Sequence, residues 1–197
     1  MKTVVILGGQ KTRLMDGAVT IDDAALMDKQ AADQALAAKG AQAGSFDLVL
    51  IPVAFAEVTT PAPIAGMDEA RWKALAEDPL MRIRVALQCA SELARAPGGA
   101  VFLIVPEIGI TGVAQLAAQS MATEGARSMA KTAARVWGAR GIIVNTIAVS
   151  VTQITGASDA RPRPSLEDIG HLALTLSDAR TATGNTVFAD GGEVMSV

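Results

Sequence analysis

The sequence predicts an α/β fold in which a mostly parallel β-sheet lies between two layers of helices. Residues 100–105 and 142–149 are short, largely apolar runs of the kind that form strands buried on both faces. Between them, residues 113–137 are too long for a strand and rich in alanine, with Gly138 and Gly141 placed to end a helix. A strand, a helix and a strand in this order form a βαβ unit, which is right-handed in nearly all known structures.

Length and composition indicate one domain spanning residues 1–197. Hydrophobic residues make up 50% of the chain, enough for a full core, yet no run approaches the roughly 18 apolar residues of a membrane span. We therefore expect no membrane association. The net charge of −3 and the lack of a basic cluster argue against nucleic acid as a partner. One cysteine and the lack of a signal-peptide pattern predict a cytoplasmic protein.

The first strand and a glycine turn are predicted from the first nine residues. Val4–Leu7 is an apolar run, and Gly8 and Gly9 follow it directly. A turn of this kind lets a phosphate group approach the backbone closely. The next apolar segment, residues 18–22, comes almost at once. Because a parallel connection needs about a dozen residues, we expect this segment to pair antiparallel with the first strand or to remain a loop.

A strand and three helical stretches are expected in the middle of the chain. Asp22 and Asp23 are predicted to cap a helix over residues 24–43, because acidic residues favour a helix N-terminus. Residues 46–51 form the next strand. A helix then begins at Asp68, is interrupted at Asp78-Pro79, where proline disfavours helical geometry, and resumes until residue 96.

The end of the chain predicts one more helix and one more strand. Pro164-Ser165 begins the helix, with Ser165 as its cap and Asp168 at the capping-box position. Residues 183–192 then supply the last strand, which ends in Asp-Gly-Gly. The intervening segment, residues 151–163, is short and polar and is expected to form a loop.

Taken together, these segments resemble the short-chain dehydrogenase/reductase family. The resemblance rests on Gly98-Gly99 before an apolar strand, on Ser120 and Gly125-Ala126 in the long helix, and on Gly-Ile-x-Val-Asn and Asp-Gly-Gly in the last strands. It implies a Rossmann-like three-layer sandwich that uses NAD(P). The first, adenosine-binding half is shortened, because the helix, strand and helix that follow the family's first loop are missing between Gly9 and Asp16.

The resemblance also implies that the family's catalytic residues are lost. Its Asn, Ser, Tyr and Lys positions are occupied here by Pro79, Pro106, Gln119 and Thr123. Gln119 cannot ionise, Pro106 has no side-chain donor and Thr123 carries no charge, so proton transfer lacks its usual groups. The whole chain contains no tyrosine. His171 and Cys89 fall on other predicted helices, and we interpret them as a surface residue and a packing residue.

The predicted cofactor groove departs from the family in the same way. Gly8 and Gly9 keep the start of the family's Gly-x-x-x-Gly-x-Gly loop, but Thr12 and Leu14 replace its later glycines. The family's Asn-Asn-Ala-Gly stretch reads Ile51-Pro52-Val53-Ala54 here. We therefore interpret Gly8-Gly9 as a vestigial loop and predict neither a cofactor nor a metal site.

Three functions stay open on the sequence alone. The first is a catalytically degenerate family protein that serves as a structural or assembly subunit of a homo-oligomer, or of a hetero-oligomer with an active relative, through helices 79–96 and 113–137. The second is an NAD(P)-dependent oxidoreductase for a carbonyl or alcohol substrate, with a rearranged site. The third is a nucleotide or small-effector binding protein without turnover, suggested by Gly8, Gly9, Lys11 and Arg13. We favour the first, because it explains the lost residues and the apolar composition together.

Overall fold

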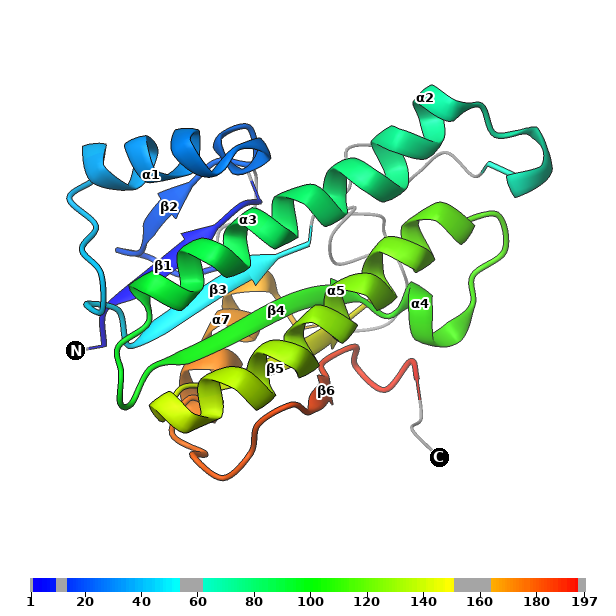
Figure 1. Ribbon diagram of the computed structural model, residues 1–197. Coiled ribbons are helices and arrows are strands. Elements are labelled where there is room, and N and C mark those ends of the chain that lie inside the picture. The colour runs from blue at the N-terminus through cyan, green and yellow to red at the C-terminus, as the bar shows by residue number, and fades with distance from the viewer. Residues whose placement is uncertain (1, 10–13, 54–61, 151–163, 195–197) are drawn as a thin grey trace.

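The computed structural model describes residues 2–9, 14–53, 62–150 and 164–194. Six strands form one sheet in the order β2-β1-β3-β4-β5-β6 (Figure 1), and every pair of neighbours is parallel. The strands are β1 (Val4–Leu7), β2 (Val19–Ile21), β3 (Leu48–Pro52), β4 (Ala100–Pro106), β5 (Ile143–Val149) and β6 (Thr186–Phe188). The predicted α/β fold with a mostly parallel sheet is confirmed.

Helices cover both faces of the sheet, as a three-layer sandwich requires. Figure 1 shows α1 (Lys29–Ala38), α3 (Asp78–Leu93) and α5 (Ala117–Trp137) in front of the sheet and α7 (Leu166–Leu176) behind it. The strands of the centre, β1, β3, β4 and β5, are buried at every position. One apolar cluster packs under the front helices and a second packs under α7. Such two-sided burial is what makes parallel strands read as continuous apolar runs.

The prediction for residues 18–22 is wrong, because β2 pairs parallel with β1. Val5 lies opposite Val19 and Leu7 opposite Ile21. A strand of three residues requires the chain to return by only about 10 Å, so a short irregular connection suffices where a longer strand would need a helix. Leu14 takes the place of that helix: it is fully buried against the back of the sheet, in the same cluster as Ile169 of α7.

The shortened first half of the sheet follows from this connection. Doubly wound dinucleotide folds have the strand order 3-2-1-4-5-6, with two strands outside the first. Within the described ranges, β2 alone lies outside β1. The chain therefore keeps the order of the remaining strands and lacks one at the β2 edge.

Two helix boundaries differ from the sequence prediction. The predicted helix over residues 24–43 is a short 3-10 turn, η1 (Ala25–Met27), followed by α1. Its cap is Asp28, which accepts a hydrogen bond from the Ala31 N–H, and not Asp22 or Asp23. Likewise the helix predicted to begin at residue 113 begins at Ala117, after the single turn α4 (Ile108–Thr111).

The predicted break at Asp78-Pro79 is replaced by a change of helix type. Asp68 caps α2 (Glu69–Trp72) as predicted, and a π-helical turn, η3 (Lys73–Glu77), leads into α3 without interruption. Pro79 lies directly after this π-helical turn, as the second residue of α3. Single π-helical turns of this kind occur as local bulges inside α-helices.

The predicted capping box at the start of α7 is confirmed. The Asp168 N–H donates to the Ser165 hydroxyl over 3.0 Å, and the Ser165 N–H donates to Asp168 Oδ2 over 2.7 Å. Hydrogen bonds from the Ser165 hydroxyl and backbone hold the pKa of Asp168 below its usual value. These contacts fix the start of the helix that covers the back of the sheet.

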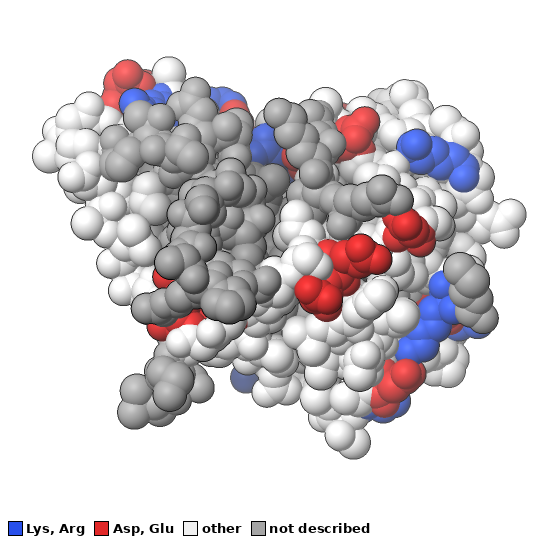
Figure 2. Space-filling view, turned by 180° about the vertical axis from the view of Figure 1, so that it is seen from behind, with Lys and Arg blue, Asp and Glu red and all other residues white. Residues whose placement is uncertain are grey.

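Charged groups are dispersed over the surface. On the face seen in Figure 2, the Lys and Arg side chains of the described residues lie in separate small groups and not in one continuous basic patch. Within the described ranges, no helix has the length and apolar character that crossing a bilayer would require.

A substitution at Gly170 tests the irregular connection. A Cβ at this position in α7 would lie 2.0 Å from the Leu14 carbonyl oxygen. Alanine normally favours a helix over glycine by about 1 kcal/mol, but overpacking against backbone costs about 1–3 kcal/mol or more. We predict that Gly170→Ala lowers the free energy of unfolding by about 2 kcal/mol in urea titrations. His171→Ala, an exposed neighbour, serves as the control, and a stabilising Gly170→Ala would contradict the contact.

Candidate functional site

The natural place for a site in this fold is the carboxyl edge of the sheet between β1 and β3. Parallel α/β sheets bind ligands where the strand order reverses, and here the chain runs from β1 outward to β2 and then back to β3. The gap at this point has a volume of about 10 Å³, the space of a single water molecule. Ligand pockets usually measure about 300–1,000 Å³.

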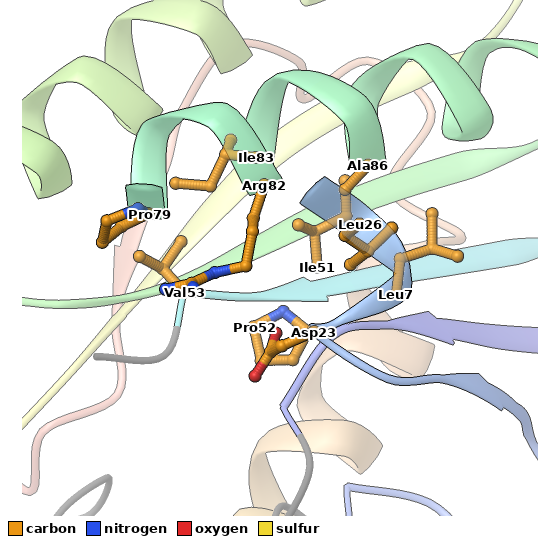
Figure 3. Close-up of a pocket in the computed structure, with 10 residues that line it drawn as sticks. All are labelled: Leu7, Asp23, Leu26, Ile51, Pro52, Val53, Pro79, Arg82, Ile83 and Ala86. Atoms are coloured by element: carbon orange, nitrogen blue, oxygen red, sulfur yellow. The ribbon is translucent and has the colours of Figure 1, made fainter. Parts of the chain in front are cut away.

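Side chains from four parts of the fold fill this gap. Figure 3 shows them converging from β1, from the segment after β2, from β3 and from α3. Most are apolar, and Asp23 and Arg82 are the two charged ones among them. The lining residues are Leu7, Asp23, Leu26, Ile51, Pro52, Val53, Pro79, Arg82, Ile83 and Ala86.

The predicted vestigial loop, Gly8-Gly9, lies at the end of β1 beside this gap. Both residues have positive φ, 102° and 79°, which explains the need for glycine. A Cβ at Gly8 would lie 2.7 Å from Asp23 Oδ1. The Gly8 N–H donates to the Ile21 carbonyl over 2.8 Å, and the Gly9 N–H donates to Asp23 Oδ1 over 3.0 Å. The space that these glycines leave open is therefore taken up by the chain's own carboxylate.

The four positions that correspond to the family's catalytic residues are all buried. Pro79 lines the gap described above, and Pro106 ends β4. Gln119 and Thr123 lie one turn apart on α5, each with no exposed surface. The Thr123 hydroxyl donates to the Gln119 carbonyl over 2.8 Å, so it is engaged within the helix. These four positions contain no group that ionises near neutral pH.

Among the described residues, the Gln119 amide is unusual because neither its nitrogen nor its oxygen has a hydrogen-bond partner, although both are buried. A buried polar group without a partner costs about 1–3 kcal/mol. Such groups are uncommon in native structures. Here the amide occupies the position that corresponds to the family's tyrosine.

The sequence analysis missed two buried polar residues at the same edge of the sheet. Glu107 follows β4 and is 3% exposed, and Ser150 follows β5 with no exposed surface. The Glu107 N–H donates to the Val149 carbonyl over 2.9 Å, so the two strand ends are joined there. The sequence feature that could have pointed to Glu107 is an acidic residue directly after a predicted buried strand. Glu107 thus adds an ionisable group to the described residues at this edge.

The single cysteine and histidine lie away from the carboxyl edge. Cys89 is buried in the front core on α3, and burial raises the pKa of its thiol to about 11, with Lys29 opposing the shift. Such a thiol stays protonated and unreactive at neutral pH. His171 is exposed on α7. Among the described residues, no group of three or more His, Cys, Asp or Glu side chains is arranged to hold a metal ion.

Comparison of the sequence with models of known protein families gives no match, and comparison with curated proteins gives none either. The resemblance to short-chain dehydrogenases/reductases therefore stays a prediction from the motifs. Because many unrelated functions share this kind of fold, function has to be argued from the residues of the site.

A substitution that removes the Gln119 amide tests whether this group lacks hydrogen-bond partners. Methionine has nearly the same length and helix propensity as glutamine but no polar atoms that require partners. We predict that Gln119→Met raises the free energy of unfolding by about 1–3 kcal/mol. The matched control is Gln34→Met on the exposed side of α1, expected to stay within about 0.5 kcal/mol of the parent. A loss of stability in Gln119→Met alone would show that the amide is partnered in solution.

Proposed function

We propose that this chain is a catalytically degenerate relative of the short-chain dehydrogenases/reductases that acts as a structural or assembly subunit of an oligomer. One observation carries the proposal: among the described residues, the chain's own side chains occupy the place beside the glycine turn where the fold would receive a dinucleotide. Asp23 Oδ1 lies 3.0 Å from the Gly9 nitrogen, and the neighbouring gap measures about 10 Å³. A pyrophosphate group would have to displace a carboxylate of the same sign.

The described residues do not fit NAD(P) at this position. A dinucleotide needs close approach to the glycine turn and an open groove along the ends of β1 and β3. Instead Asp23 contacts the turn, and Ile51 and Pro52 are buried where the family has two asparagines. At the second half of the family's site, Gln119 offers an amide and Thr123 a hydroxyl already bonded to the helix. Neither can exchange a proton with a substrate.

An assembly role is supported by the outer surface of the two helices named in the sequence analysis. One side of α5 is uncharged along its whole length, at spacings of three and four residues that fall on one helix face. We call it the α5 stripe: Ala117, Met121, Gly125, Ser128, Thr132 and Val136. Met121 is 39% exposed and Val136 is 63% exposed, and Met81 on α3 is 41% exposed.

The packing of α3 and α5 makes this surface suited to helix contacts. A Cβ at Gly125 would lie 2.6 Å from the Leu80 side chain, so the two helices approach closely there. Small residues on the α5 stripe would let a further helix approach in the same manner, and exposed methionine and valine would be buried by it. Exposed apolar side chains on neighbouring helices support a contact with another protein at this surface.

Charge placed on the α5 stripe tests the proposal. We predict that the parent chain forms a dimer or tetramer in light scattering after size exclusion, and that Met121→Lys and Val136→Lys each raise its dissociation constant at least about tenfold, because a buried unpaired charge costs several kcal/mol. Met27→Lys is the matched control: Met27 is 38% exposed and lies on η1.

A monomeric parent chain would leave only the mixed assembly. For a mixed assembly, we expect an active short-chain dehydrogenase/reductase to co-purify with the tagged chain from its native host. The Met121→Lys variant is expected not to co-purify with it. A parent chain that is monomeric at micromolar concentration and retrieves no such relative would contradict the proposal.

A further inference from the structure

The Asp23 carboxylate occupies a position that a phosphoryl group would otherwise take. Its Oδ1 accepts the Gly9 N–H over 3.0 Å and lies 2.7 Å from the point where a Cβ of Gly8 would be. Backbone N–H groups at a glycine turn are the usual partners of bound phosphate. In this chain the Gly9 N–H instead donates to the carboxylate of Asp23.

The position of Asp23 follows from the parallel pairing of β2 with β1. The Gly8 N–H extends this pairing to the Ile21 carbonyl, so the residues after β2 are brought directly beside the glycine turn. The Asp23 carbonyl then accepts the Leu26 N–H over 3.1 Å at the start of η1, and Leu26 is 1% exposed. The carboxylate is therefore held from both sides by buried structure.

The surroundings of the turn offer positive charge as well as the N–H group. Arg82 from α3 and Asp23 line the same gap, and Figure 3 shows both side chains near the ends of β1 and β3. One negative charge next to the Gly9 N–H disfavours a second at that distance by electrostatic repulsion. Without the carboxylate, the same N–H would favour an anion.

We propose that Asp23 is a built-in substitute for phosphate that keeps phosphoryl ligands off the Gly8-Gly9 turn. The inference rests on the proposed function, since it takes the turn to be a former phosphate loop. It also makes a stronger claim: the turn itself is still able to bind a phosphoryl anion, and one side chain prevents it.

The test uses inorganic pyrophosphate as the probe and the glycine amide signals of ¹⁵N-glycine-labelled full-length chain as the readout. At constant ionic strength, the parent chain is expected to show no saturable shift of the Gly8 and Gly9 signals. Asp23→Ala is expected to show one, with an affinity at least about tenfold above any residual binding by the parent chain. Asp22→Ala, which removes the same charge one residue away, is expected to behave like the parent.

Each outcome decides the inference. Saturable shifts of the Gly9 signal in the parent chain would overturn it, and so would a folded Asp23→Ala that does not respond. If Asp23→Ala loses its native spectrum, Asp23→Ser decides, because its shorter, uncharged side chain leaves the Gly9 N–H uncovered; it must then bind pyrophosphate more tightly than the parent. Binding of a nicotinamide dinucleotide elsewhere, with the glycine signals unchanged, would contradict the proposed function and not this inference.

Discussion

The parallel pairing of β2 with β1 is the constraint on which the rest of the molecule depends. The connection between the two strands, residues 8–18, is short, and Leu14 within it is buried against the back of the sheet. The same pairing carries Asp23 to the Gly8-Gly9 turn. Among the described strands, the short connection thus leaves β2 alone outside β1, and it also brings a carboxylate to the glycine turn.

Two-sided burial explains why most of the fold could be predicted from the sequence. β4 and β5 are apolar or small at nearly every position because helices cover both faces, and such runs are easy to recognise. Local signals were equally informative where the partner atoms are close in sequence, as in the capping box of Ser165 and Asp168.

The features that sequence reasoning missed depend on contacts between distant segments. The direction of β2 depends on its length and on the burial of Leu14 under α7, which no local pattern reveals. Asp23 looks like a helix cap in sequence, but its acceptor role is toward Gly9, fourteen residues earlier. The lack of partners for Gln119 is likewise a property of its surroundings, although its identity was plain from the sequence.

We propose that this chain keeps the framework of a dinucleotide-binding fold while its own side chains occupy the binding place. The most direct measurement is thermal unfolding of the parent chain with each of the four nicotinamide dinucleotides at millimolar concentration. A ligand present at 100 times its Kd would stabilise the native state by about 2.7 kcal/mol, so even modest binding would raise the Tm. We predict an unchanged Tm with all four. A saturable rise with any of them, accompanied by hydride transfer to a carbonyl substrate, would contradict the account.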